Sequence, residues 1–174
     1  MKLSDIKPTE IPAYYTTYTS KVEEGTLIDL LQKSIEKARK FLTNIPVEKT
    51  HFAYAPEKWT VADLIQHLID AERIFAYRAL RIARFDKTPL PSFEENDYAK
   101  MAQTNRRTLP DLINEYITVR QSTLQLFSSF SDEMLQNTGT ASGQNISVRA
   151  IGFIILGHEI HHFNVLTERY FVHQ

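Results

Sequence analysis

The chain has 174 residues, of which 43% are apolar and 24% charged, and its formal net charge at pH 7 is −1. These values are typical of one soluble globular domain long enough to bury a sizeable core. The balanced charge gives no sign of a nucleic-acid-binding surface, and the absence of cysteine excludes disulfides, thiolate metal ligands and a cysteine nucleophile.

The first half of the chain predicts an arm followed by two helices. Residues 1–24 contain three tyrosines and two prolines, and we expect them to form an extended arm or short helical turn packed on the body. Apolar residues recur at helical spacing over residues 26–43 and 60–84. Each of these segments opens with a threonine and, three residues later, an aspartate, which is typical of a capped helix start. Residues 46–59 connect the two helices.

The second half predicts two more long helices and a crossover. Residues 92–106 are polar, and we expect a short helix there within a long connection. A third long helix is expected over residues 108–130 and a loop over residues 131–146. Ser147 is expected to cap the last helix, which should run to about Val172.

Four long helices with one long connection between the second and the third predict an all-α four-helix bundle. Only five glycines occur in the chain, which argues against an all-β fold with many tight turns. We expect a single domain over residues 1–174. The N-terminal segment has no apolar stretch typical of a signal peptide, and AIGFIILG is too short to span a bilayer. A cytoplasmic protein without a membrane partner is therefore expected.

Three histidines fall on helix faces that should point into the bundle. His158 and His162 are four residues apart, so their Cβ atoms should lie roughly 6 Å apart on one helix face. His67 lies in the second long helix. In both helices the histidines continue a stripe of three- and four-residue steps, typical of an inward face. The stripes are Thr60, Leu64, His67, Ala71, Ile74 and Arg78 in one helix, and Val148, Ile151, Ile155, His158, His162, Val165 and Arg169 in the other.

A shared metal ion would satisfy all three inward-facing histidines at once. A buried polar group without a partner costs about 1–3 kcal/mol, and three imidazoles suit a divalent ion. Three protein ligands leave one coordination position open, as in catalytic sites. The alternative is that each histidine is an ordinary hydrogen-bonded core residue. His161 also lies one turn after His158, and the sequence does not decide whether it too faces the metal.

Three segments of the chain resemble the DinB-like superfamily, which includes YfiT-type metal-dependent hydrolases and bacillithiol transferases. They are PEKWTVADLIQHLIDAERIFAYRALRIARFD, TPLPSFEENDY and GHEIHHFNVLTERY. The most specific elements are the Trp-Thr pair that opens the second long helix, the histidine seven residues after that threonine, and the HxxxH pair. The resemblance implies an up-down-down-up four-helix bundle with a nickel or zinc site, whose ligands fall on His67, His158 and His162.

The expected function is that of a metal-dependent enzyme acting on a small molecule, either as a hydrolase or as a transferase of a low-molecular-weight thiol. We also expect a homodimer. One alternative is a non-catalytic module in which the metal only stabilises the bundle or holds a ligand. Another is an HExxH metalloprotease, because His158, Glu159 and His162 satisfy that pattern literally. The upstream position of His67 and the all-helical pattern argue against the protease.

Asp70 is the candidate catalytic base, because it lies one turn after His67 and could act on a water molecule or hold an imidazole N–H. Its ordinary alternative is a surface ion pair with Arg73. Asp63, one turn before His67, is expected to cap its helix. Arg78 lies on the same stripe as His67 and could contact an anionic substrate, although arginines at this spacing usually form a solvated face.

Overall fold

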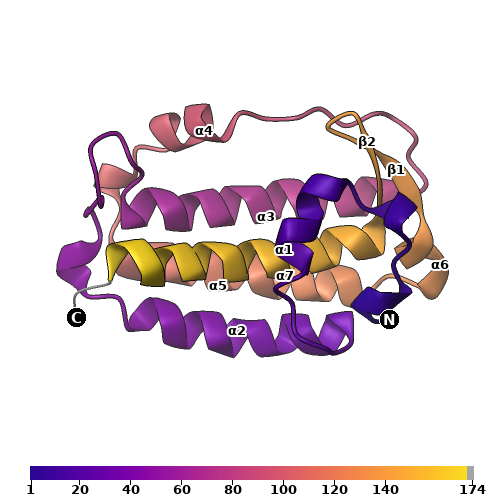
Figure 1. Ribbon diagram of the computed structural model, residues 1–174, viewed down its shortest axis with the longest axis horizontal. Helices are drawn as coiled ribbons and strands as arrows, with labels where there is room; N and C mark the ends of the chain where they lie inside the picture. Colours follow the sequence, from indigo (N-terminus) through magenta and orange to yellow (C-terminus); the bar gives the residue numbers. More distant parts are fainter. Residues whose placement is uncertain (172–174) are drawn as a thin grey trace.

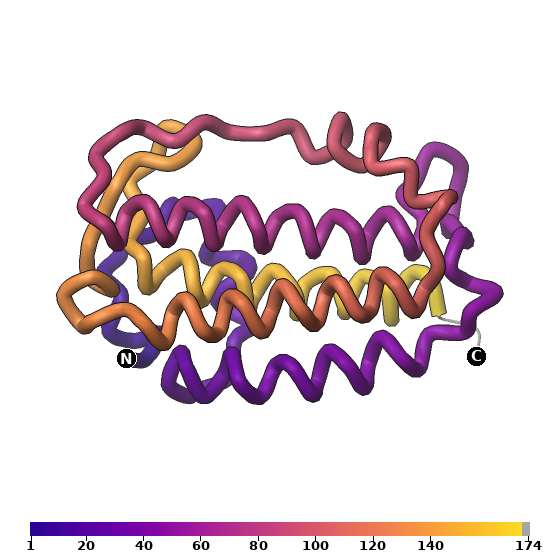
Figure 2. Tube along the Cα trace, turned by 180° about the vertical axis from the view of Figure 1, so that it is seen from behind, coloured from indigo at the N-terminus to yellow at the C-terminus, as the bar shows by residue number. Residues whose placement is uncertain are grey.

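Four long helices lie side by side in the computed structural model, which describes residues 1–171 (Figure 1). They are α2 (Leu27–Thr43), α3 (Val61–Ala83), α5 (Leu109–Ser128) and α7 (Val148–Val165). Helices α3 and α5 run in one direction and α2 and α7 in the other, so the topology is up-down-down-up (Figures 1 and 2). Both α2 and α3 pack against α5 and α7. The predicted four-helix bundle is confirmed.

The four long helices start where their capping residues predict. A threonine or serine side chain accepts a hydrogen bond from the backbone N–H three residues later at the start of each helix. The capping residues are Thr26, Thr60, Thr108 and Ser147. Helix α7 ends at Val165 and continues as a π-helical turn, Leu166–Tyr170. The predicted helix end at Val172 lies outside the described residues.

The N-terminal arm packs on α7, as predicted. It consists of three 3-10 turns, at Leu3–Asp5, Pro8–Glu10 and Ala13–Tyr15, followed by the short helix α1 (Thr16–Thr19). The arm approaches α7 at Gly157, where a Cβ atom would lie 2.3 Å from the carbonyl oxygen of Tyr18. Only glycine permits this contact, which places Tyr18 beside the residue that follows Gly157.

The long connection between α3 and α5 returns along the outside of the bundle (Figure 2). It contains the predicted short helix, α4 (Glu95–Met101), and a 3-10 turn, Thr104–Arg106. The shorter connection between α2 and α3 contains one 3-10 turn, Val47–Lys49. Helix α4 lies over the end of the bundle at which α3 begins (Figure 1).

The prediction of a loop over residues 131–146 was wrong. The segment contains a short helix, α6 (Asp132–Gln136), and an antiparallel hairpin of β1 (Thr138–Ala141) and β2 (Gln144–Ser147). The two turn residues have positive φ angles, 51° at Ser142 and 74° at Gly143, as a tight two-residue hairpin turn requires. Both strands are too short and polar to give an alternating apolar pattern, so their sequence resembles a loop.

The core consists of two apolar clusters separated by a buried polar layer. One cluster includes Leu31 and Phe153, and the other includes Leu42 and Leu112. The polar layer between them contains buried side chains from all four long helices: Ser34, Glu72, Arg120, His158 and Glu159. Within residues 1–171 no helix has the length and apolar character needed to cross a bilayer.

Candidate metal centre

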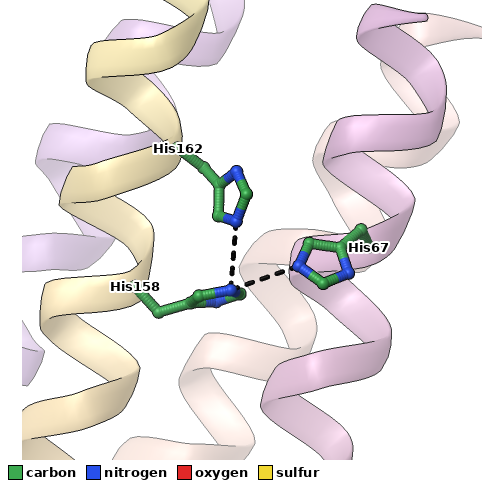
Figure 3. A group of neighbouring side chains, drawn as sticks. All are labelled: His67, His158 and His162. Atoms are coloured by element: carbon green, nitrogen blue, oxygen red, sulfur yellow. Dashed lines mark hydrogen bonds between the residues drawn. The ribbon is translucent and has the colours of Figure 1, made fainter. Parts of the chain in front are cut away.

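Helices α3 and α7 bring the three predicted histidines together (Figure 3). The Nε2 atom of His158 lies 3.1 Å from Nε2 of His67 and 3.1 Å from Nε2 of His162. His67 and His158 are buried and His162 is half-buried. One potential ligand atom from each residue lies within 4.8 Å of the others, so the three rings surround a common point.

The chemistry of the three nitrogens fits a metal ion better than it fits hydrogen bonds among the rings. An imidazole nitrogen carries either one N–H or one lone pair, so Nε2 of His158 cannot form good hydrogen bonds with both neighbours. Two nitrogens bound tetrahedrally at about 2.1 Å from a zinc ion are about 3.4 Å apart. The observed separations are close to that value, and a single ion would accept all three lone pairs.

The surroundings keep the three rings uncharged. Burial lowers the pKa of His67 to about 4. Burial, together with the neighbouring rings of His67 and His161, lowers the pKa of His162 to about 3. Burial, followed by the neighbouring His162, His67 and His161 and by Arg120, lowers the pKa of His158 well below its ordinary value. At neutral pH all three are therefore neutral imidazoles, the form that binds metal ions.

Aromatic rings enclose the histidines. The Tyr18 ring meets the His158 ring edge-on, with centroids 5.3 Å apart, and Trp59 lies 4.8 Å from His67. Phe75 lies 6.1 Å from His158 on another side. These rings reduce the access of water to the site, which strengthens electrostatic interactions within it. Nδ1 of His162 is buried and has no hydrogen-bond partner within residues 1–171, so packing rather than a hydrogen bond orients this ring.

Asp70 lies on the side of α3 that faces α5. Its Oδ1 accepts a 3.0 Å hydrogen bond from Gln66 Nε2, and Arg73 Nη1 lies 4.0 Å from the same oxygen. Gln66 in turn accepts a hydrogen bond from Arg107, and Arg73 pairs with Glu115 on α5. Burial raises the pKa of Asp70. Its contacts in the described chain belong to this network rather than to an imidazole, so its role as a base stays a prediction.

Glu159 takes part in a buried ion network that the sequence did not reveal. Its Oε2 lies 2.8 Å from Arg120 Nη1 and accepts a hydrogen bond from the Tyr116 hydroxyl. Arg120 also donates two hydrogen bonds of 2.8 Å to the carboxylate of Glu72 and one of 2.5 Å to Ser34 Oγ. Arg120 is only 1% exposed. The one sequence signal was that charged residues stand on inward helix faces. Because its carboxylate is engaged in this network, Glu159 is not the base of an HExxH protease.

The remaining candidates have separate structural roles. His161 lies outside the group of three, with its ring edge-on to Tyr18 at 5.2 Å. Asp63 caps α3, as expected, and accepts a hydrogen bond from Thr104. Arg78 is buried and donates to the carbonyl oxygen of Pro91 at 2.7 Å and to Ser142 Oγ at 3.0 Å. It therefore ties the long connection to the hairpin and is not part of a solvated face.

Comparisons with known proteins agree with this architecture. The model of a protein family described as the DinB superfamily matches residues 30–166. YfiT from Bacillus subtilis is similar in structure, with a TM-score of 0.73 and 15% identity over 94% of this chain and 90% of that chain. It is described as a probable metal-dependent hydrolase with an unusual four-helix bundle topology. The DinB-like protein YjoA from Bacillus subtilis has a TM-score of 0.57 and 18% identity over 86% of this chain and 94% of that chain. These two likenesses concern the fold. No curated protein matches the chain by sequence.

Proposed function

The chain belongs to the DinB superfamily, and from this membership and the histidine geometry we propose that it is a metal-dependent enzyme acting on a small molecule. The proposed reaction is hydrolysis, or transfer of a small thiol to an electrophile. The single observation that carries the proposal is the convergence of the Nε2 atoms of two buried histidines, His67 and His158, and one half-buried histidine, His162.

We propose zinc or nickel as the ion, because imidazole nitrogen suits both and the chain has no cysteine that would favour a softer metal. A bound divalent ion would supply a Lewis acid that lowers the pKa of a water molecule or thiol in the open position. The chain itself orients the ligands. The four-residue spacing of His158 and His162 places both on one face of α7, while His67 points toward them from α3 (Figure 3).

Two further points support the choice of reactions. YfiT, which shares the fold, is described as a probable metal-dependent hydrolase. The absence of cysteine means that any thiol must come from outside the chain, which fits a transferase whose thiol is a second substrate. The rival proposal is a non-catalytic metal module. It is favoured by the engagement of both candidate carboxylates elsewhere, since Asp70 accepts a hydrogen bond from Gln66 and Glu159 pairs with Arg120.

Metal content tests the proposal first. Purified wild-type protein should hold about one divalent ion per chain, and His158→Ala should hold none, as measured by elemental analysis. His51→Ala is the matched control, because His51 is exposed and lies in the connection before α3, and this variant should keep its metal. Wild-type protein that stays metal-free after incubation with zinc and nickel salts would contradict the proposal.

The role of Asp70 is tested with a substrate found by screening ester and amide hydrolysis and thiol transfer. Asp70→Asn keeps the shape of the side chain and removes its charge. If Asp70 is the base, turnover should fall by about 10²-fold or more while the metal content stays constant. Asp132→Asn, at an exposed position in α6, is the control. Unchanged kinetics in Asp70→Asn would remove the assignment.

The expected homodimer and cytoplasmic location stay predictions. Light scattering on the purified metal-loaded protein measures its mass in solution, and a value near 20.2 kDa, the mass of one chain, would contradict the dimer. Cell fractionation checks the location.

A further inference from the structure

A pocket of about 360 Å³ opens beside the metal centre. Its lining includes His161 and His162 from α7 and Asn96 from α4. Two cationic side chains, Lys58 from the connection before α3 and Arg169 from the π-helical turn after α7, also line the pocket. The pocket therefore joins a candidate metal ligand to two positive charges.

Aromatic contacts hold Arg169 at this pocket. Its Nη1 donates a 3.2 Å hydrogen bond to the hydroxyl of Tyr54, and its guanidinium lies 5.7 Å from the centroid of the Tyr54 ring. Tyr54 packs edge-on against Tyr170, whose hydroxyl donates a 2.7 Å hydrogen bond to the carbonyl oxygen of Trp59. A guanidinium has five N–H donors, so most of them remain available to a ligand.

The charge of the pocket favours an anion. Within residues 1–171 neither Lys58 nor Arg169 forms an ion pair, since the ion pairs of the described chain involve other residues. Glu57 is the one acidic residue in the lining, so the lining carries two positive charges and one negative charge.

The spacing suits a small molecule with two functional ends. Arg169 follows His162 by seven residues, across the end of α7 and the π-helical turn, and both side chains line the same pocket of about 360 Å³. A ligand of a few heavy atoms can therefore reach from the histidine cluster to the cationic side chains.

We propose that this pocket is the substrate site and that it selects small molecules bearing a carboxylate, which pairs with Lys58 and Arg169 while the reactive end lies at the histidine cluster. The inference rests on the proposed function, because that function places the reactive end. Arg169 provides a planar pair of donors suited to a carboxylate, and Lys58 provides a second charge. The aromatic residues around Arg169 limit its motion before a ligand binds.

Three thiols that share an HS–CH2–CH2 unit and differ in the charge of their terminal group test the charge preference. They are 3-mercaptopropionate, which is anionic, 2-mercaptoethanol, which is neutral, and cysteamine, which is cationic. Calorimetric titration into protein with a verified metal content gives each dissociation constant. We expect 3-mercaptopropionate to bind about fivefold to tenfold more tightly than 2-mercaptoethanol, the scale of two partly exposed ion pairs. The preference should weaken at high salt.

Double variants test whether Lys58 and Arg169 cause the preference for the anionic thiol. Lys58→Gln combined with Arg169→Gln should abolish the preference, and Lys58→Arg combined with Arg169→Lys should keep most of it. The matched control combines Arg84→Gln with Lys87→Gln, which changes the net charge equally at the other end of α3. Arg84 lies 5.7 Å from the Phe130 centroid, so its loss also removes an arginine–aromatic contact. The control should keep the full preference.

Each outcome decides the inference. A preference lost only in the Lys58–Arg169 double variant supports it. Equal affinity for the three thiols, no detectable binding of any thiol to metal-loaded protein, or a preference that survives the double variant would overturn it and leave the proposed function standing. Protein that holds no metal would overturn both, and the elemental analysis separates this case from the others.

Discussion

His158 and Glu159 are consecutive residues of α7, yet their side chains enter two different polar clusters in the same layer of the bundle. Glu159 joins a network in which Arg120 pairs with both Glu159 and Glu72. His158 joins His67 and His162, and its Nε2 faces two nitrogens that it cannot satisfy together. One cluster is complete with protein atoms alone, and the other needs an additional partner.

This difference separates a structural role from a binding role. A buried ion network whose members all have partners holds helices in register, and removal of one partner leaves an uncompensated charge. Burial by itself would lower the pKa of Arg120, but Glu159 and Glu72 raise it well above its ordinary value, so the arginine stays charged. The histidine cluster instead stays neutral and retains unsatisfied lone pairs, the state of a site prepared for a metal ion.

The largest predicted effect falls on the complete network. Arg120→Ala leaves Glu72 and Glu159 buried without their cation, and we expect the free energy of unfolding to fall by about 3–5 kcal/mol. Urea denaturation of the metal-free protein, monitored by circular dichroism, measures this free energy. Arg39→Ala, at an exposed position on α2, is the control and should change stability by less than about 0.5 kcal/mol. A loss below about 1 kcal/mol in Arg120→Ala would mean that the network is not what holds this layer together.

Metal binding should produce the next largest effect, and it acts only on the incomplete cluster. A metal that binds the folded state stabilises it by about 2.7 kcal/mol when its free concentration is a hundred times the dissociation constant. Thermal unfolding with and without a chelator measures the shift. His158→Ala should abolish the shift, while His51→Ala should keep it. Identical melting curves for wild-type protein with and without chelator would show that the histidines are ordinary core residues.

The sequence predicted the features that depend on local patterns. The capped starts at Thr26, Thr60, Thr108 and Ser147 follow from residues within one turn of each other. The inward direction of His67, His158 and His162 was also predictable, because they interrupt inward-facing stripes, and a shared metal was the arrangement that would satisfy all three at once. These signals are periodic or have a fixed spacing, and tertiary packing did not overrule them.

The remaining features depend on contacts between distant segments. Arg120 meets Glu72 and Glu159 from three different helices, and no local pattern shows that these charges pair with one another. The close approach of the arm at Gly157 depends on the position of Tyr18 in the folded chain. The hairpin at residues 138–147 did have a local signal, the Ser142–Gly143 turn, but its polar strands concealed it.

The smallest predicted effect is the acid sensitivity of the histidine cluster in metal-free protein. The folded pKa values of His67 and His162 are about 4 and about 3, whereas an exposed histidine in the unfolded chain titrates near pH 6.5. Below that pH the unfolded state binds protons that the folded state excludes, so stability falls as pH falls. The slope is at most about 1.4 kcal/mol per pH unit for each histidine, and it continues until the pH reaches the folded values.

Comparison of metal-free wild-type protein with His162→Gln between pH 7 and pH 5 isolates this contribution, because the carboxylates contribute equally to both proteins. Burial raises the pKa of Glu159. Glu159 on its own therefore lowers the free energy of unfolding as the pH rises, whereas the histidines raise it. Urea denaturation at each pH should show a shallower loss of stability in His162→Gln than in wild type, while the exposed-site variant His51→Ala should retain the wild-type slope. Equal slopes in wild type and His162→Gln would mean that His162 takes up protons over this pH range to the same extent in the folded and the unfolded protein, and the contrast between a neutral histidine cluster and a charged ion network would then fail.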